Sequence, residues 1–385
     1  RLDCPAQKYA WGKMGLASKV AQLVEAQGRN VDSESPYAEL WMGTHPNGPS
    51  KVMLDNGEEL LLSEYLKNHP EAVSADEDQQ AQCAELGLPY LFKILSVNTA
   101  LSIQAHPDKK LAEQLHGSRP NVYKDPNHKP EMACAITPFE ALAGFMPVSE
   151  ALKYIHATPE LQELLEENPD VKALLGDETK LLAVDEPAQK ETLKALFSTL
   201  MTSSPESVEK QVAALANRLE KVSNIEMPDA LALRLADQYP GDVGVFCAYF
   251  MCYRKLEPGQ SVFLGANEPH AYLAGDCAEI MACSDNVVRA GLTPKLRDTD
   301  TLVSMLTYRQ PSHVGSEFHP NNLLEGDERD DHSKVYAPPD PAVDEFQMER
   351  VALKGGDGPY DLSPSTYASI FVVLEGDASA ASGAD

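Results

Sequence analysis

A repeating spacing of apolar residues marks the middle of the chain as helical. One stripe advances by four, three, four and three residues: Val208, Val212, Leu215, Leu219 and Val222. Side chains at this spacing lie on one face of an α-helix. Ser204 followed by Pro205 supplies a fitting cap and first turn ahead of the stripe. Similar spacing elsewhere extends the prediction to a helical segment over 149–239.

Before the helical segment, short apolar runs predict strands. Leu91–Val97 and Leu101–His106 are two such runs. Pro107 ends the second run because a proline has no N–H to donate to a neighbouring strand. Asp108 is then placed to cap a helix that runs to Leu115.

Strand-like runs return after the helical segment and are separated by turns that contain proline and glycine. The predicted strands are Val243–Tyr253, Ser261–Leu264, Ala271–Leu273, Phe346–Leu353 and Ser369–Leu374. Short strands between such turns favour a jelly roll or cupin barrel. Residues 319–341 are charged and rich in proline, which predicts a connector. The chain is therefore expected to be mainly β, with an α-helical insertion.

These patterns predict three domains. Residues 1–148 and 240–308 form a discontinuous cupin-like or jelly-roll barrel domain, which the helical domain of residues 149–239 interrupts. Residues 309–385 form a second, smaller β domain of the jelly-roll type. Residues 377–385 are small and polar, without a run of strand-forming side chains, so we expect no strand there.

The composition of the chain argues against several classes of function. The net charge of −27 argues against nucleic acid and anionic membrane surfaces as partners. No apolar run approaches the roughly 18 residues of a membrane helix. The first residues, Arg1–Pro5, lack the apolar region of a secretory signal. Seven cysteines without a Cys-x-x-Cys motif indicate reduced thiols and a cytoplasmic location.

Four side chains that are far apart in the sequence offer donors for a divalent metal. Gln104 and His106 are two residues apart on a predicted strand, so they point to the same face. Glu131 adds a carboxylate, and His270 adds a second imidazole. Two nitrogen and two oxygen donors suit zinc, manganese or iron.

The alternative for each histidine is an ordinary hydrogen-bonded role, since a Gln-x-His pair alone is a weak signal. Charged neighbours favour the metal hypothesis. Lys129 stands two residues before Glu131, and Asp285 and Arg289 follow His270. A chain of net charge −27 needs such local cations if it is to bind an anionic ligand.

Longer motifs carry a family resemblance. They are Tyr9–Gly12, Ala38–Pro46, Leu88–Lys93, Leu101–Pro107, Asn127–Ala133, Pro269–Asp276 and Ser284–Lys295. In this order the motifs resemble the type I mannose-6-phosphate isomerase (phosphomannose isomerase) family. The resemblance covers most of the chain through about Lys295 and weakens after Tyr308. Members of the family usually continue well past the equivalent of Gly376, so the resemblance implies that the last β domain is incomplete here.

The resemblance implies a zinc-dependent aldose–ketose isomerase. Such an enzyme interconverts mannose 6-phosphate and fructose 6-phosphate through an enediol, and supplies mannose for GDP-mannose and glycosylation. The resemblance makes the cupin-like domain catalytic and implies one zinc ion per chain, with four ligands: Gln104, His106, Glu131 and His270. The partner is then a small sugar phosphate, and we expect a monomer.

Arg289 is the residue that we expect to be catalytic, because a guanidinium stays cationic and grips oxyanions in a fixed geometry. The alternative is a structural salt bridge with Asp285, which otherwise orients Arg289 or handles a proton. Lys129 is expected to contact a substrate oxygen, with a solvated surface lysine as its alternative. Glu279 is a candidate base or an exposed carboxylate at the rim.

The remaining site residues are expected to bind substrate. Ser102 lies on the predicted face of Gln104 and, like Lys295, is a candidate for the phosphate, mainly by resemblance. Trp11 and Lys93 match the pocket wall of the family, although Trp11 suits a hydrophobic core equally well.

Two other classes compete with the isomerase. One is a metal cupin of oxygenase-like chemistry, which the glutamine in the ligand set disfavours, since a non-haem iron site usually offers two histidines and one carboxylate. The other is a non-catalytic sugar-binding protein, which has no need of cations around a metal. Sequence leaves open the proton-transferring base and the choice of zinc over another divalent metal. It also leaves open whether the helical domain closes over substrate.

Overall fold

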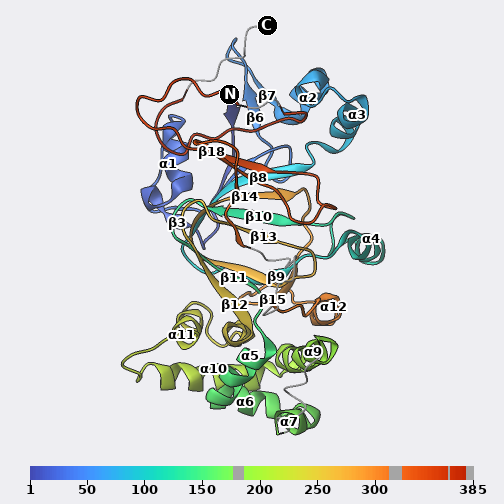
Figure 1. Ribbon diagram of the computed structural model, residues 1–385, viewed down its shortest axis with the longest axis vertical. Helices are drawn as coiled ribbons and strands as arrows, with labels where there is room; N and C mark the ends of the chain where they lie inside the picture. Colours follow the sequence, from blue (N-terminus) through green and yellow to red (C-terminus); the bar gives the residue numbers. More distant parts are fainter. Residues whose placement is uncertain (177–185, 312–322, 363–364, 379–385) are drawn as a thin grey trace. The chain divides into compact units, whose positions relative to one another are not determined.

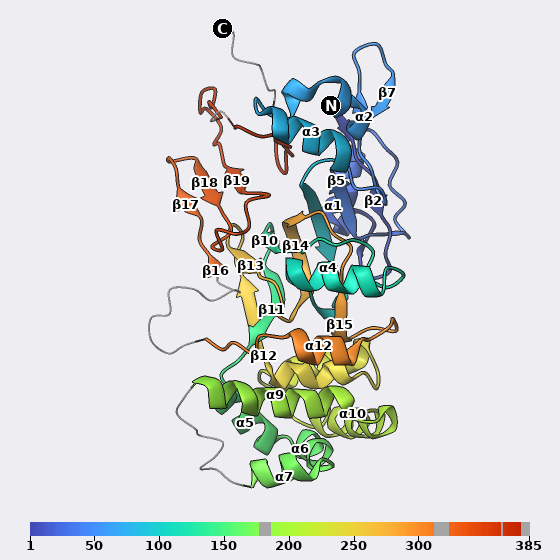
Figure 2. The same ribbon diagram turned by 90° about the vertical axis from the view of Figure 1, so that its right-hand side faces the viewer.

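The computed structural model describes residues 1–176, 186–311, 323–362 and 365–378 (Figures 1 and 2). The chain divides into two compact units. The first unit joins Arg1–Ser96 to Ala352–Asp385, and the second unit is Val97–Val351. The predicted domain bounds at 148, 240 and 309 remain a prediction.

The first unit is built on a buried antiparallel sheet of order β2-β5-β8. Every residue of β8 is buried, including the polar Lys93 and Ser96. Two smaller sheets belong to the same unit: a three-stranded sheet of order β1-β6-β7 and a two-stranded sheet of β3 and β4. The strands are β1 Leu2–Asp3, β2 Ala6–Gln7, β3 Lys13–Met14, β4 Pro36–Tyr37, β5 Glu39–Met42, β6 Lys51–Met53, β7 Glu59–Leu61 and β8 Tyr90–Val97. The helices are η1 Gly15–Ala17, α1 Lys19–Ala26, α2 Leu62–Asn68, η2 Pro70–Ala72 and α3 Glu77–Leu86.

Within the second unit, one long strand, β14, pairs with β10, β11 and β9. Its later half pairs with β10, and its first residues pair with β11 and β9. The remaining partners are β13 and β16 beside β10, β12 beside β11, and β15 beside β9. The strands are β9 Ile103–Ala105, β10 Glu131–Ala135, β11 Phe139–Phe145, β12 Met251–Leu256, β13 Ser261–Leu264, β14 His270–Ala282, β15 Val288–Gly291 and β16 Leu323–Leu324. A separate sheet holds β17 Asp327–Glu328, β18 Ser333–Tyr336 and β19 Met348–Val351.

The helices that follow β11 in the sequence gather at one end of this unit, on the side of β12 (Figures 1 and 2). They surround a hydrophobic core shared with η3. Their bounds are α5 Val148–Ala157, α6 Pro159–Glu166, α7 Pro169–Leu175, α9 Glu186–Thr202, α10 Pro205–Leu219, α11 Asp229–Gln238 and η3 Val243–Tyr249. Two further helices are α4 Lys109–Ser118 and α12 Thr299–Met305. The expectation of a sheet-rich fold with a helical insertion is therefore confirmed.

The structure confirms the predicted helix α10 and its cap. The Ser204 hydroxyl oxygen accepts a hydrogen bond from the Ser207 N–H at 3.1 Å. The apolar stripe from Val208 to Leu219 is buried against the other helices. The buried stripe ends at Leu219 rather than at the predicted Val222, because α10 ends at Leu219 and Val222 is 43% exposed.

The helix predicted after Pro107 is also confirmed. The Asp108 carboxylate accepts a hydrogen bond from the Leu111 N–H at 2.9 Å, which caps α4. This cap places the end of β9 directly before the first turn of a helix. His106 is the first of the three residues between β9 and α4, so it has ordered elements on both sides.

The strand predicted over Val243–Tyr253 is wrong in its first part. Residues 243–249 form the buried 3-10 helix η3, and a strand begins only at Met251. The Asp242 carboxylate caps η3 by accepting from the Gly244 N–H at 2.7 Å, and it also accepts from the Leu292 N–H at 2.6 Å. An apolar run that is buried on all sides does not reveal its period, so sequence alone does not separate the two structures.

The strand predicted over Ser369–Leu374 is wrong. Within the described part of the chain these residues adopt no strand, and the neighbouring Tyr367 forms only an isolated bridge with Ser74. Phe371 is 68% exposed and Val373 is 45% exposed. Apolar alternation makes a strand only where a neighbour supplies hydrogen bonds and a covering surface.

The connector predicted over 319–341 is only partly correct. Residues 319–322 lie outside the described residues, and β16, β17 and β18 fall within the rest. Of the predicted polar tail, residues 379–385 lie outside the described residues. Across the ranges that the structure describes, no helix has both the length and the apolar character needed to cross a membrane.

The cap of α10 gives a test of the helical insertion. Ser204→Ala removes the oxygen that accepts from the Ser207 N–H, so the free energy of unfolding should fall by about 1 kcal/mol. Urea unfolding followed by circular dichroism measures this change. Ser207→Ala, which keeps the capped N–H, is the matched control and should stay within about 0.5 kcal/mol of the unsubstituted protein. Equal stability of both variants would contradict the cap.

Candidate metal centre

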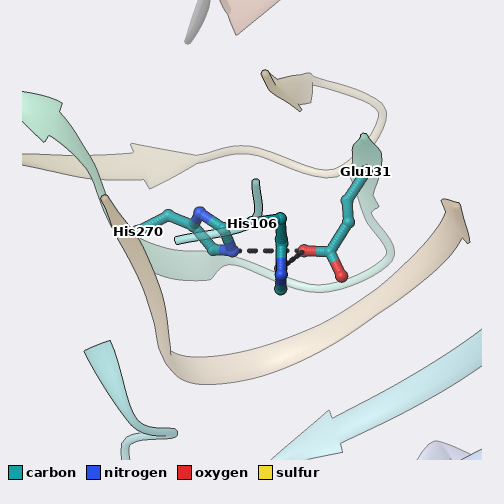
Figure 3. Close-up of side chains that lie close together, drawn as sticks. All are labelled: His106, Glu131 and His270. Carbon is teal, nitrogen blue, oxygen red and sulfur yellow. Dashed lines mark ion pairs between the residues drawn. The ribbon is translucent and has the colours of Figure 1, made fainter. Parts of the chain in front are cut away.

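Three side chains from separate elements converge in the second unit. His106 follows β9, Glu131 begins β10 and His270 begins β14. One donor atom from each lies within 4.8 Å of the others. Figure 3 shows a dashed line from each imidazole ring to one oxygen of the Glu131 carboxylate. All three side chains are buried, with exposures of 0%, 1% and 1%.

A bend in β14 brings these residues together. In the ladder between β10 and β14, Glu131 lies opposite Met281, which is 281 − 270 = 11 positions from His270. In a straight strand that separation is roughly 35 Å. The Glu131 Oε2 and His270 Nε2 atoms are nevertheless 3.2 Å apart. The strand turns at Gly275, where φ is 109° and a Cβ would lie 2.5 Å from the Pro138 carbonyl oxygen, so glycine is required.

Main-chain carbonyls fix the orientation of both imidazoles. The His106 Nδ1–H donates to the Asn286 carbonyl oxygen at 2.7 Å. The His270 Nδ1–H donates to the Glu268 carbonyl oxygen at 3.1 Å. Because a carbonyl oxygen only accepts, Nδ1 carries the proton in each ring, and in a neutral ring the lone pair is on Nε2. Both Nε2 atoms are therefore free to act as donors to a metal.

The three converging atoms are acceptors without a donor between them. Glu131 Oε2 lies 3.4 Å from His106 Nε2 and 3.2 Å from His270 Nε2. Among the described residues, none of these three atoms has a hydrogen-bond partner. A buried polar atom left without a partner costs about 1–3 kcal/mol. A cation at their centre removes that penalty, so the residues fit a metal ion.

The charges at the site agree with this arrangement. Burial lowers the pKa of His106 to about 4, with a further contribution from the positive charge of Lys129. Burial alone would raise the pKa of Glu131, but Lys129 and His106 outweigh it and hold that pKa well below the usual value. The Lys129 Nζ lies 2.8 Å from Glu131 Oε1, which leaves Oε2 for the metal. The site thus pairs a neutral imidazole with an ionised carboxylate.

Gln104 lies between His270 and Arg289 in the sheet. It is directly opposite His270 on β14 and directly opposite Arg289 on β15. Residues directly opposite on antiparallel strands share a face, with Cβ atoms about 4.5–5.5 Å apart. The three side chains therefore form one row, and the row begins at a histidine of the converging set.

Arg289 is half-buried beside this row. Burial lowers the pKa of its guanidinium, whereas a carboxylate partner would raise that pKa. The structural salt bridge with Asp285 that sequence offered as the alternative stays a prediction. Asp285 itself is exposed, and its N–H donates to Asp125 Oδ2 at 2.8 Å.

Glu279 is buried, with 3% exposure, so the alternative of an exposed carboxylate at the rim is wrong. It lies opposite Ala133, two residues from Glu131 on β10, and thus on the face of that ligand candidate. Burial raises the pKa of Tyr272 well above its usual value, and the charges of Glu279 and Glu131 add to the effect. These three side chains are therefore close to one another.

The other candidates are not among the three converging side chains. Ser102 is half-buried just before β9, and Lys295 is exposed after β15. Trp11 and Lys93 belong to the first unit. Trp11 is half-buried and stacks on Tyr9 with ring centroids 5.9 Å apart, so it is not a core residue. Lys93 is buried with its Nζ 5.1 Å from the centre of the Trp41 ring. Their roles toward substrate stay predictions.

Sequence reasoning missed the loop that holds the His106 imidazole. The Asn286 side-chain amide donates to the Asp125 carbonyl at 2.7 Å and to the Asn127 carbonyl at 3.0 Å. The Ser284 hydroxyl donates to Asp125 Oδ1 at 2.8 Å. These contacts tie the carbonyl that accepts from His106 to the segment that leads into Lys129. The Ser-Asp-Asn run was the available signal, but a carbonyl partner has no signature of its own in a sequence.

The converging atoms give a direct test. His270→Ala removes one of two imidazole donors, so the variant should lose stoichiometric metal while keeping its fold. Elemental analysis of the purified variant, with circular dichroism for the fold, measures both. His116→Ala is the matched control, because the His116 imidazole contacts the Tyr123 carbonyl outside the cluster. Full metal content in the His270 variant would exclude that residue as a ligand.

Comparison with known proteins shows which family this chain belongs to. The catalytic-domain model of type I phosphomannose isomerase matches residues 1–148, and the model of its helical insertion domain matches residues 172–251. The mannose-6-phosphate isomerase of Cryptococcus neoformans is 45% identical, over 98% of this chain and 89% of its own length. The human mannose-6-phosphate isomerase is 40% identical, over 97% of this chain and 87% of its own length. A crystal structure described as zinc-bound mannose 6-phosphate isomerase matches with a TM-score of 0.70 and 31% identity, over 90% of this chain and 82% of that one. The chain belongs to the type I phosphomannose isomerase family.

Proposed function

We propose that this protein is a zinc-dependent mannose-6-phosphate isomerase, which interconverts mannose 6-phosphate and fructose 6-phosphate. The observation that carries the proposal is the buried convergence of His106 Nε2, His270 Nε2 and Glu131 Oε2 in a member of this family. Relatives named as mannose-6-phosphate isomerases align over nearly the whole chain. A solved relative is described as holding zinc.

The proposed zinc ligands are His106, Glu131, His270 and Gln104. Two imidazole nitrogens and a carboxylate oxygen are donors that zinc accepts, and Gln104 stands opposite His270 on the neighbouring strand. Zinc bound there would act as a Lewis acid that polarises the sugar carbonyl. The hydrogen bonds from each Nδ1–H to a main-chain carbonyl oxygen keep both imidazoles in the tautomer that zinc requires.

Arg289 is the proposed catalytic residue. Aldose–ketose isomerisation moves a proton between adjacent carbons, and negative charge develops on oxygen as the enediol forms. The Arg289 guanidinium lies in the row that starts at His270 and passes through Gln104. It is half-buried, and burial strengthens the attraction between its fixed charge and an oxyanion. Its role is to bind and stabilise that oxygen.

The candidates for the group that carries the proton are Glu279, Lys129 and Asp285. Glu279 is buried on the face of Glu131 beside Tyr272. Lys129 contacts Glu131, so its ammonium also orients that carboxylate. A base must reach the migrating proton within hydrogen-bond distance, and burial together with proximity to the cluster favours Glu279 and Lys129 over the exposed Asp285.

The phosphate end of the substrate needs cations in a chain of net charge −27. Lys295 and Ser102 are the proposed phosphate contacts, and Trp11 and Lys93 the proposed pocket wall. Exposure of Lys295 leaves its ammonium accessible to an anion arriving from solvent. Binding energy at the phosphate positions the reacting carbons at the metal end of the sugar.

The finer fold and setting are also proposals. We propose that the sheets around β14 form a cupin barrel, which the bend at Gly275 supports, and that residues 309–385 belong to a jelly-roll-like domain. We further propose a cytoplasmic monomer that supplies mannose for GDP-mannose and glycosylation. Sedimentation velocity tests the monomer. Family membership disfavours both an oxygenase-like cupin and a non-catalytic sugar-binding protein.

Removal of the metal tests the reaction. Dialysis against a chelator should abolish the interconversion of mannose 6-phosphate and fructose 6-phosphate, and added zinc should restore it. A coupled assay for fructose 6-phosphate measures the rate. Magnesium is the control and should not restore activity, because it prefers six oxygen ligands over imidazoles. Full activity in protein shown to be metal-free would end the metal proposal.

Substitution of the arginine tests the catalytic role. Arg289→Ala should lower turnover by roughly 10²–10³-fold, the usual cost of losing one donor to a developing oxyanion, while zinc remains stoichiometric. Steady-state kinetics and elemental analysis measure these two quantities. Arg329→Ala is the matched control, since the Arg329 guanidinium pairs with Glu349 at 2.8 Å in the sheet of β17 to β19. Normal turnover in the Arg289 variant would remove the assignment.

A further inference from the structure

The loop before His270 is clamped to the segment that carries His106. Asn267 lies three residues before His270, and its φ of 61° is in the left-handed region. Glycine and asparagine are the residues that adopt this region most readily. The Asn267 N–H donates to the His106 carbonyl oxygen at 2.7 Å. The Thr307 N–H donates to the Asn267 carbonyl oxygen at 3.2 Å.

The Asn267 side chain adds a second pair of contacts to the same segment. Its Oδ1 accepts from the Asp108 N–H at 3.2 Å, and its Nδ2 donates to Asp108 Oδ2 at 2.8 Å. The other Asp108 oxygen accepts from the Leu111 N–H at 2.9 Å, the cap of α4. One asparagine thus makes three hydrogen bonds to residues 106–108 and joins them to an ordered helix.

Other contacts hold the rest of the loop independently. The Gly144 N–H donates to the Pro269 carbonyl oxygen at 2.8 Å. The Thr307 hydroxyl donates to the Glu268 carboxylate. The Glu268 carbonyl oxygen accepts from His270 Nδ1. These contacts fix the loop to β11 and to the residues after α12. Asn267 links the loop to residues 106–108, in addition to the pairing of His270 with Gln104 on the neighbouring strand.

We propose that Asn267 is a positioning residue, which sets the separation of His106 and His270 before any metal binds. The inference rests on the proposed metal site and deepens it. Two imidazoles on separate segments bind one ion tightly only if their spacing is already fixed, since otherwise metal binding must order the segments. Zinc affinity therefore depends on the pairing of Asn267 with Asp108, although neither side chain is a proposed ligand.

Exchange of the two side chains tests this pairing. Asn267→Asp places two carboxylates against each other, and Asp108→Asn places two amide groups against each other. Each change should weaken zinc binding about ten-fold, the lower end of the range for residues that support metal ligands. The double variant restores one amide opposite one carboxylate, and asparagine also caps a helix well. Its zinc affinity should return close to that of the unsubstituted protein.

Competition of the metal-free proteins with a chromophoric chelator measures the zinc affinity of each variant. Asn267→Gly separates the side chain from the backbone, because glycine adopts the same φ without strain but lacks the side-chain contacts. If the side-chain contacts matter, this variant should also bind zinc more weakly. Ser204→Ala is the stability control: it loses a distant helix cap and should bind zinc unchanged.

Unchanged zinc affinity in the Asn267 and Asp108 single variants would overturn the inference, and so would a double variant as weak as its parents. In both cases the unsubstituted protein still binds one zinc ion and remains active, so the proposed function survives. An unsubstituted protein that binds no zinc would instead overturn the proposed function together with the inference.

Discussion

The Nδ1–H groups of His106 and His270 both donate hydrogen bonds to main-chain carbonyl oxygens, and the rest of the site depends on that constraint. With those protons placed, each neutral ring presents a lone pair at Nε2. The Glu131 carboxylate faces both lone pairs from inside the same buried space. Three acceptors that face one another repel unless a cation lies between them. The protein tolerates this repulsion because its strands and loops hold the three side chains in place.

The sheet explains why these particular residues meet. β14 contributes His270 at its start, bends at Gly275 and pairs with β10 near its end. Its first residue lies opposite Gln104, and Gln104 lies opposite Arg289 on the next strand. The proposed metal donors His270 and Gln104 and the cationic Arg289 therefore stand on one face of the sheet. Under the proposed function, a sugar that reached a metal at that face would also reach a fixed positive charge, and stabilisation of an enediol needs both.

Much of this could be predicted from the sequence where the signal is local or repeated. The α10 stripe, the Ser204 cap and the Asp108 cap follow from spacing and cap chemistry. The three converging donors were identified from their chemistry and from motif resemblance. The helical part of Val243–Tyr253 was missed because an apolar run buried on every side hides its period. The strand over Ser369–Leu374 failed because strands need partners that a local pattern does not report. Main-chain contacts, such as the Asn286 carbonyl and the Asn267 N–H, depend on the fold alone.

The central claim is that one zinc ion is held between His106, Glu131 and His270. Diffraction from crystals of the zinc-loaded protein, recorded on both sides of the zinc absorption edge, locates the ion without reference to activity. The account predicts one anomalous peak about 2.0–2.2 Å from His106 Nε2, His270 Nε2 and a Glu131 carboxylate oxygen. A zinc peak elsewhere in the protein, with no density between these three side chains, would contradict it.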